Sequence, residues 1–351
     1  MAQAARAHST IAASTMVACS VSACSALLLL AAPAAAQTPE QFYKGKTVTI
    51  MLGHPPGGSY HMYAMLASNH IRRHIPGNPN VIIEHRPGGG GVRAVRHFYS
   101  QAPRDGSVIG LFPETLPHVE LLQPDIGQWK TAEMPYIGSF SGVGAVMIRR
   151  KDAPAKSFAE MRKLSSNVGC TGKTSQAYQT ASMMKNLGDF NFKIICGYPG
   201  SADYVLALQR GELDMVSSAW LQWRTSHTDE IAAGSMVPVI QTGLRRNNEL
   251  KDLPLLQEVV EDPTAKRIIE FLSAGTAIGR ALSAPPKVPE DRLAVLRAAF
   301  DKTVKDPEFL KDAARIKAQI DPTPGVELQK DVADIIAAPS DIIERAKVVM
   351  N

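Results

Sequence analysis

The sequence predicts an α/β protein of two domains, and three features indicate this. Apolar runs alternate with Gly/Pro-rich loops and with segments of helical spacing, a pattern typical of parallel strands joined by helices. This pattern occurs in two blocks, which short apolar strands separate. The chain has 351 residues, 45% of them hydrophobic and 20% charged, which is ordinary globular composition and long enough for two cores.

The two blocks are similar in organisation. In the first block we expect strands over 46–52, 80–85 and 106–112, and helices over 63–75 and 92–102. In the second block we expect strands over 165–170, 191–197 and 213–220, and helices over 176–188 and 203–212.

The segments between the blocks predict where the chain crosses from one domain to the other. Strands 134–140 and 143–150 mark the outward crossing, and residues 271–286 mark the return. The expected domains are therefore residues 37–140 with 276–351, and residues 141–275. The C-terminal part is predicted to be helical over 289–306, 307–317 and 325–349, with a division near Pro339.

Residues 1–36 have the composition of an export signal. Arg6 is their only Lys, Arg, Asp or Glu residue, and a long Ala/Ser/Leu run ends in Ala34 and Ala36, the small-x-small pattern of a cleavage site. We expect cleavage near Ala36 and a periplasmic mature protein. Two alternatives stay open, a membrane-spanning helix and a lipoprotein anchored at Cys24.

Composition and charge favour a small ligand over a polymer. Without residues 1–36 the net charge is about +4, which suits capture of small anions. No Lys/Arg tract is dense enough to follow a nucleic acid backbone, and aromatic residues make up only 6% of the chain. We therefore expect no nucleic acid partner.

Four Gly/Pro-rich loops stand where a strand hands over to a helix: 55–59 (PPGGS), 86–91 (RPGGGG), 171–175 (TGKTS) and 198–202 (YPGSA). A helix begins with unpaired N–H groups and a partial positive charge, and glycine lets that backbone approach a ligand closely. Ser59 is placed to be an N-cap or a hydroxyl donor. Because each block carries two such loops, the sequence predicts an anion held in a cleft between the domains.

Five stretches together resemble a known family: residues 43–68, 81–110, 168–175, 196–216 and 250–260. They are similar to the substrate-binding receptors of tripartite tricarboxylate transporters, the Bug or TctC-like periplasmic proteins. The resemblance implies a two-domain type II periplasmic binding protein fold with two crossover hinge strands. It also implies closure on a carboxylate that backbone N–H groups and hydroxyls hold.

The resemblance, with the aromatic residues near the loops, gives the expected ligand-binding residues. The first domain would contribute Gly57, Gly58, Ser59, Tyr60, Gly88, Gly89 and Gly90. The second would contribute Thr171, Thr174, Ser175, Tyr198, Gly200, Ser201, Ser217, Ser218 and Trp220. The chain departs from the family pattern at His54, His61, Thr174 and Trp220, which leaves the identity of the ligand open.

Three other features of the sequence compete with this interpretation. Residues 167–174 resemble a phosphate-binding P-loop, but Asn167 stands where the first glycine is required. His70 and His74 have a spacing that chelates metals, but no HExxH pattern accompanies them, and we expect no metal or cofactor. Cys170 and Cys196 end two strands joined by one helix. Neighbouring strand ends lie within disulfide range, so a bridge and two buried thiols both stay open.

The sequence therefore predicts an extracytoplasmic receptor that captures a small organic acid and delivers it to the permease subunits of a tripartite transporter. We expect a monomer without catalytic residues. The alternatives are a receptor for another solute that feeds a signalling protein, and a secreted hydrolase. No GxSxG elbow supports the hydrolase.

Overall fold

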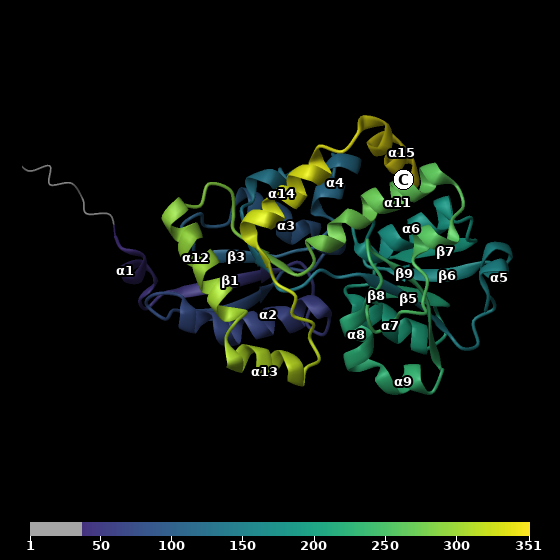
Figure 1. Ribbon diagram of the computed structural model, residues 1–351, viewed down its shortest axis with the longest axis horizontal. Helices are drawn as coiled ribbons and strands as arrows, with labels where there is room; N and C mark the ends of the chain where they lie inside the picture. Colours follow the sequence, from purple (N-terminus) through teal and green to yellow (C-terminus); the bar gives the residue numbers. More distant parts are fainter. Residues whose placement is uncertain (1–36) are drawn as a thin grey trace, which may run out of the picture. The chain divides into compact units, whose positions relative to one another are not determined.

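A computed structural model describes residues 37–351 of the protein, and within this range the strands form two separate sheets (Figure 1). Sheet A has the order β11-β4-β10-β3-β1-β2, and sheet B has the order β7-β6-β8-β5-β9. The strands of sheet A are β1 (Thr47–Leu52), β2 (Asn80–His85), β3 (Val108–Leu111), β4 (Tyr136–Ser139), β10 (Ala281–Ser283) and β11 (Thr323–Pro324). Those of sheet B are β5 (Ala145–Arg150), β6 (Ser166–Cys170), β7 (Phe192–Cys196), β8 (Met215–Ala219) and β9 (Met236–Thr242).

Sheet A confirms the first block of the sequence pattern. β1 lies between β2 and β3 and is parallel to both, and Val48, Ile50 and Leu52 are fully buried. α2 (Ser59–His70) follows β1, and α3 (Val92–Ser100) connects β2 to β3. This is the βαβ arrangement that the alternation of apolar runs and helical segments predicts.

Sheet B confirms the second block. β6 is parallel to β7 and β8, whereas β5 is antiparallel to β8 and β9. α6 (Gln176–Leu187) connects β6 to β7, and α7 (Ser201–Gln209) connects β7 to β8. The remaining short helices within the described residues are α1 (Pro39–Tyr43), α4 (Leu116–Leu122), α5 (Phe158–Lys163), α8 (Trp220–Ser226), α9 (Thr228–Ala232) and α10 (Leu256–Val259), with the 3-10 turns η1 (Ile71–His74), η2 (Gly89–Gly91), η3 (Thr131–Glu133) and η4 (Ala274–Ala277).

The chain crosses between the sheets at the two predicted places. It leaves sheet A after β4 and enters sheet B at β5, and it returns through α11 (Pro263–Ser273) and η4 to β10. Because β10 pairs antiparallel with both β3 and β4, the returning chain completes the centre of sheet A. Residues 39–351 pack as one compact unit that contains both sheets.

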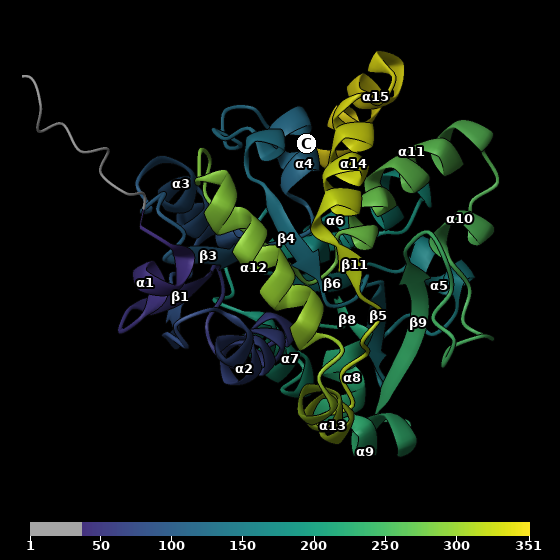
Figure 2. The same cartoon turned by 60° about the vertical axis from the view of Figure 1, so that its left-hand side comes forward.

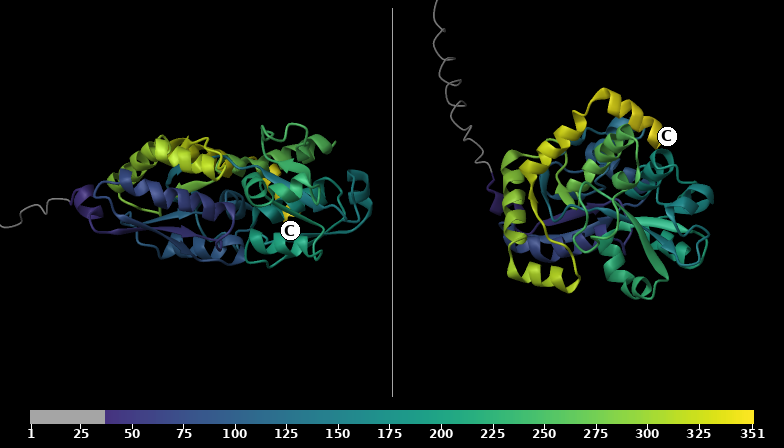
Figure 3. Two further views of the ribbon diagram at one scale, coloured as in Figure 1. Left: turned by 90° about the horizontal axis from the view of Figure 1, so that it is seen from below. Right: turned by 45° about the vertical axis from the view of Figure 1, so that its right-hand side comes forward.

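Four C-terminal helices cover the sheets (Figures 2 and 3). They are α12 (Glu290–Thr303), α13 (Pro307–Arg315), α14 (Gly325–Ile336) and α15 (Ser340–Met350). α12 and α14 pack against β4, and α13 packs against α2. α15 differs, because Ala346, Val349 and Met350 are buried in the apolar cluster that surrounds sheet B.

The predicted signal segment, 1–36, lies outside the described residues, as do the alternatives of a lipid anchor at Cys24 and a membrane-spanning helix there. Among the helices of residues 37–351, none combines the length and the apolar character that crossing a bilayer requires.

Candidate functional site

Three helices that each follow a strand after a short loop define the site. α2 follows β1 in sheet A, and α6 and α7 follow β6 and β7 in sheet B. The N-caps of α2 and α7 are Gly58 and Gly200, and neither provides a side-chain cap. The first N–H groups of these two helices are therefore available to a ligand. The expectation that Ser59 is an N-cap is wrong, because Gly58 takes that position with extended backbone and Ser59 is the first helical residue.

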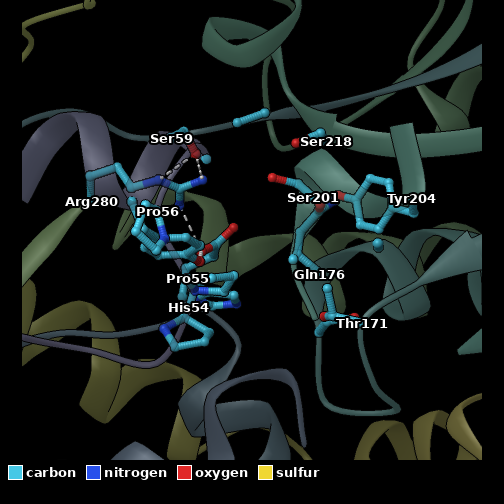
Figure 4. A pocket seen from close by; sticks show the side chains of 18 residues that line it. His54, Pro55, Pro56, Ser59, Thr171, Gln176, Ser201, Tyr204, Ser218 and Arg280 are labelled. Atoms are coloured by element: carbon cyan, nitrogen blue, oxygen red, sulfur yellow. Dashed lines mark hydrogen bonds and ion pairs between the residues drawn. The ribbon is translucent and has the colours of Figure 1, made fainter. Parts of the chain in front are cut away.

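A cavity, which we call the cleft cavity, lies between these helix starts. Counted to its open mouth, it has a volume of about 570 Å³. Figure 4 shows its labelled side chains in two opposed groups, with His54, Ser59 and Arg280 on one side and Thr171, Gln176 and Ser201 on the other. The full lining is His54, Pro55, Pro56, Gly58, Ser59, Tyr60, Pro113, Glu114, Thr171, Ser175, Gln176, Ala177, Gly200, Ser201, Tyr204, Ser218, Ala219 and Arg280.

A buried ion pair forms the sheet A side of the cleft cavity. Arg280 Nη1 lies 2.8 Å from Glu114 Oε2, and each side chain is only 3% exposed. Arg280 Nη2 also donates to Ser59 Oγ at 2.9 Å. Since Ser59 Oγ accepts this bond, its own hydrogen is free to point at a ligand. Arg280 thus supplies positive charge next to the start of α2 and makes Ser59 a donor.

Two rings extend this network along the cavity wall. The Tyr60 hydroxyl donates to Glu114 Oε2, and the guanidinium of Arg280 lies 3.9 Å from the centre of the Tyr60 ring. The His54 ring stacks on the Tyr60 ring, with 4.5 Å between the two ring centres. Burial, assisted by the charge of Arg280, lowers the pKa of His54 to about 4, so His54 is neutral near pH 7.

Several polar atoms at the site have no partner within residues 37–351. Thr171 Oγ1 and His54 Nδ1 both line the cleft cavity, and both are shielded from solvent without a hydrogen bond. Buried polar atoms normally pair with protein, water or ligand. Their position indicates that the cavity is built to hold a polar occupant.

The structure brings half of the predicted binding residues to the cleft cavity. Gly58, Ser59, Tyr60, Thr171, Ser175, Gly200, Ser201 and Ser218 line it, whereas Gly57, Gly88, Gly89, Gly90, Thr174, Tyr198, Ser217 and Trp220 do not.

The glycine-rich loop 86–91 of sheet A contacts the loop 171–175 of sheet B and does not line the cavity. Gly88, Gly89 and Gly90 all have positive φ, so this turn requires glycine. Thr174 Oγ1 donates to the Gly89 carbonyl oxygen at 2.8 Å. A Cβ on Gly90 would lie 2.8 Å from Thr174 Oγ1. These residues therefore set how closely the two sides of the cleft approach.

The other residues outside the cavity are held by different partners. The Trp220 indole donates to Glu249 Oε2 at 2.6 Å and lines a separate hollow. The Ser217 carbonyl accepts a bond from the Tyr204 hydroxyl at 2.8 Å. Tyr198 packs edge-on to Tyr204. Ser217 and Tyr198 thus contact Tyr204, which lines the cleft cavity.

Cys170 and Cys196 form a disulfide in the structure, with 4.5 Å between their Cα atoms. They are register partners at the ends of β6 and β7. Thr171 follows directly, and the loop to Gly200 begins one residue after Cys196. The bridge thus ties together the bases of both sheet B loops that reach the cavity.

The remaining motifs have structural partners. His70 Nε2 lies 2.9 Å from Asp312, and His74 Nε2 lies 2.9 Å from Asp306, so each imidazole links α2 or η1 to the α13 region. Within residues 37–351 no group of three or more His, Cys, Asp or Glu side chains is arranged to hold a metal ion. Lys173, in the P-loop-like stretch, is exposed.

Sequence reasoning missed Arg280, Gln176 and Tyr204. Gln176 directly follows a predicted loop, and its place at the first turn of α6 was a usable signal. Arg280 lies on the returning chain more than 200 residues from Ser59, and no local pattern marks it.

A comparison with protein families matches residues 67–347 to the tripartite tricarboxylate transporter family receptor, TctC. The chain belongs to this receptor family. A comparison with curated protein sequences found no match.

Solved structures with a similar fold include three receptors of this kind. The periplasmic binding protein BugD is 20% identical with a TM-score of 0.69, and the match covers 88% of this chain and 98% of BugD. MatC (Rpa3494) from Rhodopseudomonas palustris with bound malate is 18% identical with a TM-score of 0.68, over 87% and 99%. R. palustris Rpa4515 with adipate is 18% identical with a TM-score of 0.67, over 86% and 97%. This TctC-family receptor thus has the two-domain periplasmic binding protein fold.

Proposed function

We propose that this TctC-family receptor captures a small organic acid in the cleft cavity and delivers it to the permease subunits of a tripartite transporter. The observation that carries the proposal is that two helix starts without side-chain caps, Gly58 on α2 and Gly200 on α7, face one cavity from opposite sheets. Such N–H groups and the helix dipole favour an anion.

The side chains around these helix starts complement a carboxylate. Ser59 has a free hydroxyl hydrogen because Arg280 occupies its acceptor side. Thr171 Oγ1 provides a second hydroxyl from the opposite side. A carboxylate bound between the starts of α2 and α7 satisfies donors of both sides at once, so closure of the cleft and binding are coupled.

The solved relatives support this ligand class. The structure of MatC has bound malate and that of Rpa4515 is with adipate, and both compounds are carboxylates. We infer a periplasmic location for the mature chain, after cleavage near Ala36, and a monomeric receptor without catalysis.

For the lobes we propose the divisions 37–140 with 276–351, and 141–275. Although α15 belongs in sequence to the first lobe, its residues Ala346, Val349 and Met350 are buried in the apolar cluster around sheet B, so this helix packs on the second lobe. The segments between β4 and β5, and between η4 and β10, then act as the hinge.

The test is a thermal-shift screen of the mature protein against carboxylates, amino acids and uncharged solutes. We expect stabilisation by carboxylates without turnover. The variant Gly58→Val should weaken this binding, because a Cβ at Gly58 would lie 2.8 Å from Ser201 Oγ on the opposite side. Stabilisation by uncharged solutes alone, or unchanged affinity in Gly58→Val, would contradict the proposal.

A further inference from the structure

The cleft cavity does not end at Gln176. A second hollow, with a volume of about 250 Å³ when its open mouth is counted, shares Glu114 and Gln176 with the cleft cavity as lining residues, and we call it the inner chamber. The two spaces are therefore adjacent. The lining of the inner chamber is Glu114, Gln176, Gln179, Thr180, Met183, Thr242, Leu272, Ser273, Gly275 and Thr276.

Apart from Glu114, the inner chamber is lined by uncharged side chains, most of them polar. The Thr180 and Thr242 hydroxyls lie 3.0 Å apart, and Gln176 Nε2 donates to Thr180 Oγ1 at 2.7 Å. Ser273 is only 2% exposed, and its hydroxyl has no hydrogen-bond partner within residues 37–351. A buried hydroxyl without a partner on the wall of a hollow indicates a polar occupant.

The single charge on this wall is the carboxylate of Glu114. Its Oε2 atom accepts from both Arg280 and Tyr60. Among residues 37–351 no protein group donates a hydrogen bond to the other oxygen, Oε1. An ionised carboxylate oxygen accepts hydrogen bonds only, so the matching ligand group is a donor.

The charges around the two spaces also limit the ligand. Arg280 and Glu114 offset each other, and His54 is neutral near pH 7. The positive potential that remains at the cleft cavity comes from the starts of α2 and α7, whose N-caps Gly58 and Gly200 line the cleft cavity and not the inner chamber. Arg280 already pairs with Glu114, and the lining of the inner chamber includes no Lys or Arg, so a second ligand carboxylate there would have no cation of its own.

We propose that the ligand is a monocarboxylic acid with a hydroxyl or ammonium group on its chain, and that this group donates to Glu114 at the entrance to the inner chamber. The inference deepens the proposed function and rests on it. The carboxylate binds at the helix starts in the cleft cavity, and the donor, at the other end of the ligand, binds Glu114 and Ser273, which both line the inner chamber.

The test compares acids of matched chain length, from four to seven carbons, by calorimetry on the mature protein. At each length the set contains the plain monocarboxylate, the ω-hydroxy acid, the ω-amino acid and the dicarboxylate. At the best length we expect the hydroxy or amino acid to bind about tenfold more tightly than the other two, which is the discrimination of one charge-assisted hydrogen bond. Comparing the ω-hydroxy acid with the ω-amino acid shows whether the donor group is a hydroxyl or an ammonium.

Two sets of variants locate the effect. Glu114→Gln should remove the preference and bring dicarboxylate affinity to at least that of the hydroxy acid. Ser273→Val should exclude long ligands by filling the inner chamber, whereas Ser273→Ala, the matched control, should keep them with a loss of only a few-fold. The serine pair keeps the test valid if Glu114→Gln does not fold.

The outcomes separate the two proposals. If no carboxylate binds, the proposed function itself fails. If carboxylates bind but the dicarboxylate equals or exceeds the hydroxy and amino acids on the wild-type protein, only the present inference is overturned. Equal long-ligand affinity in Ser273→Val and Ser273→Ala would likewise exclude the inner chamber as part of the site.

Discussion

Replacing Gly200 with alanine tests whether the two sides of the cleft meet in the ligand-bound form. The backbone at Gly200 is extended, with φ of −156°, so alanine adopts it without strain. A Cβ there would lie 2.8 Å from Pro55 Cγ and 3.2 Å from Pro55 Cδ. Pro55 belongs to the loop after β1 in sheet A, and its ring has little freedom to move aside. The overlap is therefore relieved by parting the two loops.

The expected magnitude follows from this overlap. Overpacking of a tight contact costs roughly 1–3 kcal/mol, which corresponds to a dissociation constant about 5- to 150-fold higher. We expect the contact only in the form in which the two loops lie together, so the unliganded protein in an open form should unfold within about 1 kcal/mol of the wild type. The assay is calorimetric titration with the acid identified by the screen, together with urea unfolding of the unliganded protein.

Gly243→Ala is the matched control, because Gly243 lacks positive φ and its Cβ would meet its nearest neighbour at 3.5 Å, an ordinary contact. We expect wild-type affinity for this variant. If Gly200→Ala also binds with wild-type affinity, the two loops do not come together around the ligand, and the closure argument is refuted.

Three further predictions concern the disulfide bridge, the buried His118 and Trp220, which lies outside the cleft cavity. Replacing both Cys170 and Cys196 with serine should lower the unfolding free energy by about 3 kcal/mol, given the 26-residue separation. If mass spectrometry of the unreduced mature wild type finds both cysteines alkylated, the disulfide is absent and this prediction is contradicted. Burial lowers the pKa of His118 to about 4 against 6.5 when unfolded, so the unfolded state binds the proton first and stability falls as pH drops from 6.5 towards 4. Between pH 7.5 and 5 this histidine should account for about 2 kcal/mol of the loss in urea unfolding, and His118→Gln should lose correspondingly less; equal losses would contradict the assignment. Trp220→Ala should leave ligand affinity within about twofold of wild type, because the indole bonds Glu249 outside the cleft cavity. A tenfold loss of affinity in calorimetry would show that Trp220 contributes to the binding site.

Local patterns in the sequence determined much of the fold. The apolar runs of β1, β2, β6 and β7 and the Gly/Pro loops after them predicted the strand-to-helix transitions, because strand burial and helix starts depend on neighbouring residues. The same loops predicted the sheet A and sheet B sides of the cavity at Ser59 and Ser201. The family resemblance added the type II periplasmic binding protein fold.

Only the tertiary structure decided which loops line the cavity and which hold its sides together. The loop at Gly88–Gly90 has the composition of a ligand loop, yet it bonds Thr174 across the cleft. Arg280 reaches Ser59 and Glu114 only because β10 returns to the centre of sheet A between β3 and β4. A residue's own neighbours in sequence fix its backbone conformation. Its charge partners are fixed by contacts between distant segments, which the sequence does not display.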